Sequence, residues 1–167
     1  MKLLIVSDTH GRYERLREAC ELHKDVDALV FLGDGISDID RAGVSEFGFT
    51  IFAVRGNWDY SNSSLIAMKA KNDMTLEFEG VKIYALHGHT KQVKSGILNA
   101  LYAAAAVDAD VLLYGHTHEQ YYTFLEGNKY NIGKDMHVFN PGSLGGYYYG
   151  LCEIKDGKAK FYTKTLF

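Results

Sequence analysis

Most of the histidines in this 167-residue chain lie in short polar clusters, and other clusters of the same kind hold aspartate or asparagine. Five of the seven histidines fall in these clusters, and each cluster directly follows an apolar run. Imidazole, carboxylate and amide groups are protein ligands of divalent metals such as Mn, Fe, Zn and Ni. The clusters are Ser7-Asp8-Thr9-His10, Gly33-Asp34, Gly56-Asn57, His87-Gly88-His89 and Gly115-His116-Thr117-His118. Together they predict a metal centre.

Each cluster alone has an ordinary structural explanation. Asp8 can cap a turn, and Gly33-Asp34 is a common turn sequence. His116 and His118 are more specific, because residues two apart in an extended segment point to opposite sides and can serve two neighbouring metals. All five clusters follow predicted strands, and we therefore favour one shared site over five unrelated turns.

The apolar runs before the clusters are typical of buried strands. They cover residues 3–6, 28–32, 50–54, 81–86 and 111–114, and residues 74–79 pair with 81–86 as a hairpin around Glu79-Gly80. In open α/β sheets, binding groups collect at the carboxyl ends of the strands. The five clusters are therefore expected to meet in one crevice.

The remaining patterns predict the fold class. Apolar spacing predicts a helix over residues 12–23, and Ser95 is predicted to cap a second helix. The inner face of that second helix would hold Leu98, Leu101, Tyr102 and Ala105. Strand patterns cover residues 121–126, 136–139, 148–154 and 158–164, with a surface loop at 127–135. We predict an α/β fold, a two-sheet αββα sandwich that forms one domain over residues 1–167.

Composition excludes several classes of protein. An apolar share of 47% with 23% charged residues is ordinary for a soluble globular domain. The formal net charge is -3 and no segment concentrates Lys and Arg, so a nucleic-acid polymer is not an expected partner. The apolar run near the N-terminus is too short for a signal peptide or a membrane span. Two scattered cysteines suit a reducing compartment, and we expect a cytoplasmic protein without membrane contact.

In their order along the chain, the clusters resemble those of the calcineurin-like metallophosphoesterases. Chain length and the segment Asn140-Pro141-Gly142-Ser143 are similar to the small YfcE-like phosphodiesterase branch, and the resemblance runs from residue 3 to about residue 143. It implies two metal ions. It assigns Asp8, His10 and His118 to one ion, assigns Asn57, His87 and His116 to the other, and places Asp34 as a bridge between them.

The resemblance also implies an activity, namely metal-dependent hydrolysis of small organic phosphodiesters. A hydroxide between the two divalent ions would attack phosphorus in line, with Asp34, Asn57 and His89 as the catalytic residues. Manganese is the expected metal, and Ni, Fe, Zn, Co and Mg are the alternatives. Two divalent cations outweigh the charges of Asp8, Asp34 and the hydroxide, so the site stays positive and suits a phosphodiester anion.

Trp58 departs from the family pattern. In many members of the family that this chain resembles, the corresponding sequence is Gly-Asn-His-Asp, and its histidine is thought to protonate the leaving group. This chain has Gly56-Asn57-Trp58-Asp59 instead. Trp58 is interpreted either as a wall of the pocket rim or as a stacking partner for an aromatic part of the substrate. His89 is a substitute acid, a support for a ligand, or a structural hydrogen-bonding residue. Asp59 is expected to cap the following turn or to support Asn57.

Two other functions compete with this interpretation. A protein-binding scaffold with a vestigial site, as in the small metallophosphoesterase-like subunit of retromer, should have lost ligands, but all seven positions here hold competent side chains. A DNA nuclease of the same superfamily would carry further domains and basic surfaces. The expected partner is a small phosphodiester, and the pattern leaves a homo-oligomer open.

Overall fold

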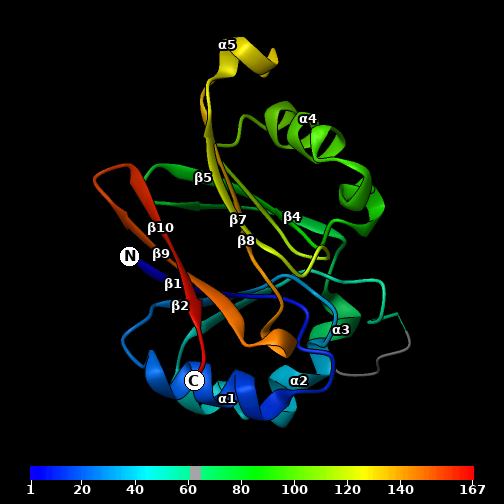
Figure 1. The fold of residues 1–167 in the computed structure, drawn as a ribbon. Helices are drawn as coiled ribbons and strands as arrows, with labels where there is room; N and C mark the ends of the chain where they lie inside the picture. The colour runs from blue at the N-terminus through cyan, green and yellow to red at the C-terminus, as the bar shows by residue number, and fades with distance from the viewer. Residues whose placement is uncertain (61–64) are drawn as a thin grey trace.

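Two five-stranded sheets form the framework of the protein, as seen in a computed structural model that describes residues 1–60 and 65–167 (Figure 1). The first sheet has the order β10-β9-β1-β2-β3. Its strands are β1 (Lys2–Val6), β2 (Ala28–Phe31), β3 (Thr50–Ala53), β9 (Tyr148–Lys155) and β10 (Lys158–Thr165). In this sheet β1, β2 and β3 are parallel, and β9 and β10 run antiparallel at one side.

The second sheet is also mixed. Its order is β4-β5-β6-β8-β7, with β5, β6 and β8 parallel and the two outer strands antiparallel to their neighbours. Its strands are β4 (Asp73–Phe78), β5 (Val81–Leu86), β6 (Val111–Tyr114), β7 (Gln120–Leu125) and β8 (Met136–Pro141). The predicted two-sheet α/β sandwich is thus confirmed.

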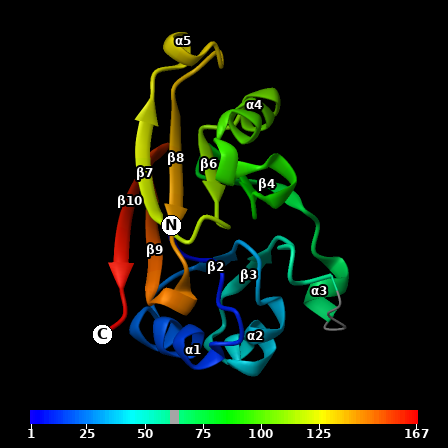
Figure 2. The ribbon, with the colours of Figure 1, turned by 45° about the vertical axis from the view of Figure 1, so that its right-hand side comes forward.

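Helices cover the outer faces of both sheets (Figures 1 and 2). Helices α1 (Tyr13–Leu22) and α2 (Ile36–Arg41) pack on the first sheet, and α4 (Leu98–Ala106) packs on the second. Two short helices, α3 (Leu65–Lys69) and α5 (Gly127–Tyr130), lie in connections. Within the parts of the chain that the structure describes, no helix is long and apolar enough to span a bilayer.

The alternation of side chains along β1 explains why its apolar run has no polar interruption. Leu3 and Ile5 face the core between the two sheets, whereas Leu4 and Val6 face the core beneath α1. All four side chains are fully buried, as expected for a strand that is covered on both faces. Because β1 is packed on both faces, the position of the residues that follow Val6 is fixed.

The helix at residues 98–106 differs from its prediction. Ser95 does not cap it, because residues Val93–Ser95 form a separate 3-10 turn and α4 begins at Leu98. The buried face holds Ala100, Leu101 and Ala104, while Leu98 and Tyr102 are more than half exposed. The buried face thus shares only Leu101 with the predicted face, and alanine side chains supply the rest of it.

Two other predictions of local structure were incomplete. The predicted loop at residues 127–135 contains the short helix α5, and its ends are joined by a hydrogen bond from the Gly127 amide to the Asp135 carboxylate. The sequence patterns also missed α2 and α3, which are too short to show helical periodicity. Cys20 and Cys152 are buried and free, as expected for small core residues.

Phe139 gives a direct test of the core between the sheets. It is fully buried, stacks on Phe161 at 4.9 Å, and lies against Gly150, where an added Cβ would come within 2.5 Å of its ring. We expect Phe139→Ala to lower the free energy of unfolding by about 3–5 kcal/mol, because it leaves a cavity that rigid strands cannot close. Urea unfolding measures this.

The matched control is Leu22→Ala, since Leu22 is 60% exposed at the end of α1. This substitution should change the free energy of unfolding by less than about 0.5 kcal/mol. Equal effects of the two substitutions would contradict the packing described for Phe139.

Candidate metal centre

Loops from both sheets meet at one end of the sandwich, where the parallel strands have their carboxyl ends. Backbone hydrogen bonds join the loops in pairs. The Asp8 amide donates to the Gly33 carbonyl at 2.9 Å, and the Gly115 amide donates to the His87 carbonyl at 3.0 Å. The His116 amide links the sheets by donating to Asp8 Oδ2 at 3.0 Å. These hydrogen bonds therefore hold ligand candidates that are distant in sequence close together in fixed positions.

The segment Asn140–Ser143, which begins with the last two residues of β8, supports two of these loops. The Ser143 hydroxyl donates to the Asp8 carbonyl at 2.8 Å. The Asn140 side-chain amide lies 3.0 Å from both the Gly115 carbonyl and the Thr117 hydroxyl. This segment holds the loop after β1 and the loop after β6 in position without supplying a ligand itself.

The first group of metal-ligand candidates consists of Asp8, His10 and His118, whose ligand atoms all lie within 4.8 Å of one another. His118 Nε2 is 3.2 Å from Asp8 Oδ1, and His10 Nε2 is 3.7 Å from the same oxygen. Among the described residues, this buried oxygen has no hydrogen-bond partner. Buried polar atoms are normally satisfied, so an unpaired carboxylate oxygen among imidazoles fits a cation.

The second group consists of Asp34, His87 and His116. His87 Nε2 lies 3.4 Å from Asp34 Oδ2 and 3.1 Å from His116 Nδ1. The other ring nitrogen of His87 is 2.7 Å from the Leu32 carbonyl, to which it donates. This bond selects the tautomer whose Nε2 lone pair faces the group, which is the usual second support of a metal-binding histidine.

Asp34 lies between the two groups. Its Oδ2 is 3.4 Å from His87 Nε2 and 3.9 Å from His10 Nε2, which belong to different groups. Its Oδ1 accepts the Trp58 amide at 2.8 Å. One carboxylate therefore faces both groups while its second oxygen is fixed by the loop after β3.

Asp59 fixes the loop that carries Asp34. Its buried carboxylate accepts four backbone amides: Oδ2 binds those of Asp34 and Gly56 at 2.8 Å each, and Oδ1 binds those of Gly35 and Ile36 at 2.9 and 3.0 Å. Asp59 thus joins the loop after β2 to the loop after β3. The turn that it was predicted to cap continues into residues 61–64, which lie outside the described residues. Gly56 is required here, because an added Cβ would lie 2.1 Å from Asp34 Oδ1.

Five of the predicted ligands have a left-handed backbone, which is uncommon for residues other than glycine. Their φ angles run from 47° to 68°, at Asp8, His10, Asp34, His116 and His118. Such conformations cost free energy and persist where the surroundings fix them. Here the interloop hydrogen bonds and the carboxylate of Asp59 do so.

The electrostatics favour the metal-binding forms of His116 and Asp34. At His87, burial lowers the pKa, but the hydrogen bond with Asp34 and the charge of Asp8 outweigh it and raise the pKa. Burial, followed by the charge of His87, lowers the pKa of His116 to about 4, so its ring is neutral near neutral pH. Burial alone would raise the pKa of Asp34, but the contact with His87 and the Trp58 amide outweigh it, so the pKa is lowered. A neutral imidazole and an ionised carboxylate are the forms that bind metal.

The other two predicted catalytic residues lie at the margin of these groups. Asn57 is exposed on the turn after β3, between Gly56 and Trp58. The ring of His89 lies 5.4 Å from that of His87, and its Nε2 is 3.2 Å from the Tyr60 hydroxyl. The metal-ligand role of Asn57 and the catalytic role of His89 stay predictions. Sequence reasoning missed Tyr60, although it follows Asp59 directly.

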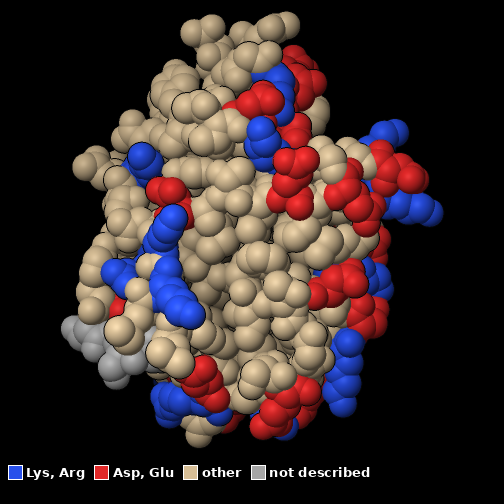
Figure 3. All heavy atoms as spheres, turned by 180° about the vertical axis from the view of Figure 1, so that it is seen from behind, with Lys and Arg blue, Asp and Glu red and all other residues tan. Residues whose placement is uncertain are grey.

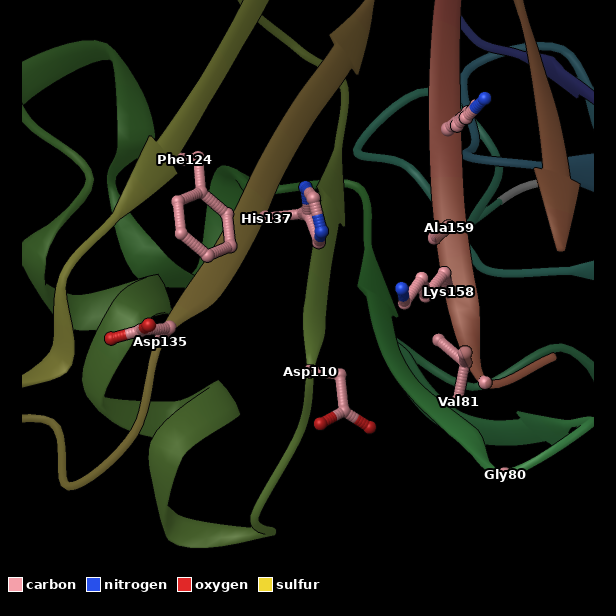
Figure 4. A pocket seen from close by; sticks show the side chains of 10 residues that line it. Gly80, Val81, Asp110, Phe124, Asp135, His137, Lys158 and Ala159 are labelled. Carbon is pink, nitrogen blue, oxygen red and sulfur yellow. The ribbon is translucent and has the colours of Figure 1, made fainter. Parts of the chain in front are cut away.

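Another cavity lies at the opposite end of the sandwich (Figure 4). It measures about 520 Å³ and is lined at the amino ends of β5, β6 and β8 by residues such as Val81, Asp110 and His137. Asp110 already accepts the Lys82 amide and pairs with Lys134, so its carboxylate has a structural role. A smaller cavity of about 320 Å³ touches the metal-ligand candidates through His10 and Asp34.

Residues 1–157 match the model of the calcineurin-like phosphoesterase superfamily domain. The chain belongs to this superfamily. It is 30% identical over 165 residues to phosphodiesterase MJ0936 of Methanocaldococcus jannaschii, which covers 92% of this chain and 90% of that protein. A solved archaeal phosphodiesterase has a TM-score of 0.72 at 24% identity over 98% of this chain and 100% of its own. A Vps29 mutant from Entamoeba histolytica has a TM-score of 0.71 at 18% identity over 99% of both chains, which shows the fold alone.

Asp59 gives the sharpest test of how this calcineurin-like site is held. In Asp59→Asn one oxygen becomes an NH₂ donor, and whichever oxygen is lost, two of the four amides face that donor instead of an acceptor. We expect a loss of about 2–6 kcal/mol in the free energy of unfolding, because each of the two unsatisfied buried amides costs about 1–3 kcal/mol. Urea unfolding and metal analysis of the purified protein measure the effect.

Asp40→Asn is the matched control, because Asp40 is exposed on α2. It should leave stability within about 0.5 kcal/mol of the wild type and leave metal content unchanged. If Asp59→Asn also behaves like the wild type, the carboxylate does not organise the two loops.

Proposed function

We propose that this calcineurin-like phosphoesterase is a metal-dependent phosphodiesterase that hydrolyses small organic phosphodiesters. The observation that carries the proposal is the position of Asp34, whose Oδ2 faces one histidine of each group at 3.4 and 3.9 Å. A carboxylate shared by two neighbouring groups is the arrangement that a two-metal hydrolase requires. The sequence similarity to phosphodiesterase MJ0936 supports a diester substrate.

The candidate ligands would bind two divalent ions. Asp8, His10 and His118 would hold one divalent ion, His87 and His116 the other with the amide oxygen of Asn57, and Asp34 would bridge them. When bound, the two ions supply a hydroxide at neutral pH and neutralise charge that develops on the phosphoryl oxygens. Manganese is the metal we propose; the donor set, which mixes imidazole with carboxylate oxygen, suits Mn and also Fe, Zn and Ni.

His89 would act on the leaving group. It begins the 3-10 turn after β5, beside both histidines of the second group, with ring separations of 5.4 Å from His87 and 6.3 Å from His116. Its hydrogen-bonding neighbour is the Tyr60 hydroxyl, 3.2 Å from Nε2. In this proposal, the pair would pass a proton to a leaving oxygen at the second group through one water.

The size of the site and the distribution of charge favour a small substrate. The cavity beside His10 and Asp34 measures about 320 Å³, at the lower end of the range for small-molecule sites. On the face shown in Figure 3, Lys and Arg side chains gather along the left side and mix with Asp and Glu toward the right, around an uncharged centre. Binding a nucleic-acid polymer depends on many phosphate contacts from Lys and Arg, so a polymer substrate is not part of the proposal.

A metal series tests the enzyme proposal. We expect hydrolysis of bis-nitrophenyl phosphate to rise when Mn is added to metal-depleted protein. Asp34→Asn, which removes the shared charge, should bind less metal and turn over at least about 100-fold more slowly. Absence of diesterase activity with Mn, Fe, Co, Ni and Zn would instead favour the non-catalytic, protein-binding alternative. Two tightly held metals with full turnover in Asp34→Asn would remove its bridging role.

Trp58→His tests the consequence of lacking an acid at this position. A histidine has an unperturbed pKa near 6.5 and can protonate a basic leaving oxygen near neutral pH. A positioned general acid is typically worth about 10²–10⁴-fold, chiefly where the leaving group is poor. We therefore expect kcat for alkyl diesters to rise at least about tenfold, while kcat for nitrophenyl diesters changes little.

Trp58→Leu is the control, since it removes the indole equally but brings no proton. The ratio of alkyl to nitrophenyl kcat should rise in the histidine variant alone. The same ratio in both variants would show that proton donation at position 58 does not limit the reaction.

A further inference from the structure

Trp58 is an exposed aromatic residue on a rigid turn beside the metal-ligand candidates. Its side chain is 75% exposed. The backbone beneath it is fixed, because its amide donates to Asp34 Oδ1 at 2.8 Å and the next residue is the buried Asp59. Most of the indole is therefore free of packing contacts, although Trp58 is one of the residues that line the cavity beside His10 and Asp34.

The indole is also not stacked on its nearest ring. It meets the ring of His10 at a centroid distance of 5.9 Å with the planes at 88° to each other. A perpendicular contact of this kind orients the indole but leaves room for a parallel partner. Holding a large apolar ring at a metal centre in this way has no evident role in the stability of the fold.

The cavity of about 320 Å³ could hold a ring that stacks parallel to the indole. Trp58 lines this cavity together with His10 and Asp34 from the metal-ligand candidates, and Gly11, Gly35 and Ser37 also contribute to the lining. An added Cβ at Gly11 would meet no atom within 4 Å, so the space there is open. A group bonded to a phosphate at the metal-ligand candidates would therefore extend past the indole.

We infer that Trp58 stacks on an aromatic ring in one ester arm of the substrate, so that the preferred substrates are aryl or nucleoside phosphodiesters rather than purely alkyl ones. This inference rests on the proposed function and adds the class of substrate. Stacking of a base on an aromatic side chain is worth about 1–3 kcal/mol, which corresponds to roughly 5- to 150-fold in affinity. The indole thus raises the affinity for the substrate. This role is separate from proton donation to the leaving group, which Trp58 cannot perform.

Pairs of inhibitors that differ only in the ring test this inference. Phenyl phosphate is compared with ethyl phosphate, and thymidine monophosphate with deoxyribose phosphate, as inhibitors of bis-nitrophenyl phosphate hydrolysis. Within each pair the phosphate is common, so its contact with the metals cancels in the ratio of inhibition constants. We expect the aromatic member to bind at least about fivefold more tightly to the wild type. The pair with the larger ratio identifies the aryl or the nucleoside source.

Three variants separate stacking from general apolar contact. Trp58→Phe keeps an aromatic face and should retain the preference, whereas Trp58→Leu keeps apolar bulk and should lose it. Tyr102→Leu removes another half-exposed aromatic residue, on α4, and should leave both ratios unchanged. Ratios near one in the wild type, or a preference that survives in Trp58→Leu, would overturn the inference.

Fluorescence provides a readout that does not depend on turnover. Trp58 is the only tryptophan in the chain, so the emission reports on this position alone. In zinc-loaded protein, phenyl phosphate or thymidine monophosphate should quench the emission saturably, while ethyl phosphate and deoxyribose phosphate should not. If the protein has no diesterase activity, the proposed function is wrong. The titration still shows whether Trp58 stacks on an aromatic ring. Equal responses to all four compounds would overturn the inference even in an active enzyme.

Discussion

The carboxylate of Asp59 accepts four backbone amides from two different loops, and the geometry of the metal-ligand candidates depends on this contact. A buried carboxylate loses its hydration, and hydrogen bonds from the surrounding amides must replace it. The contact is therefore stable only when the loop after β2 and the loop after β3 are both in place. It fixes Asp34, Gly56 and the start of α2 as one unit.

The strained backbone of the ligand candidates follows from this arrangement. Asp8 and Asp34 adopt left-handed φ angles of 54° and 59°, which an isolated loop would avoid. The sheets supply the rest of the constraint, because β1 and β2 are buried on both faces and the Asp8 amide binds the Gly33 carbonyl. Packing of the core thus holds two buried carboxylates and several imidazoles at distances that a divalent cation would stabilise.

Much of the site could be predicted from sequence because each ligand candidate follows an apolar strand. Parallel strands bring their carboxyl ends together, so Asp8, Asp34 and His87 needed only the strand assignments to be placed near one another. The role of Asp59 could not be predicted, because its amide partners include residues of another loop that no local pattern connects to it. The exposure of Trp58 likewise depends on packing around the turn.

The helix predictions failed for a related reason. Ser95 is a common capping residue, but the chain turns into a 3-10 segment before α4 begins. Helix α2 is short, and the amide of its first residue, Ile36, is bound by Asp59 from the neighbouring loop. Its stability therefore comes partly from a tertiary contact, which helical periodicity does not show.

Anomalous diffraction from crystals of the manganese-loaded protein tests the central claim most directly, because it locates each ion relative to Asp34. The account predicts two manganese ions per chain about 3.5–4 Å apart, with the Asp34 carboxylate between them. It also predicts that the four amides around Asp59 keep their places. A single ion, or a second ion bound away from Asp34, would contradict the account.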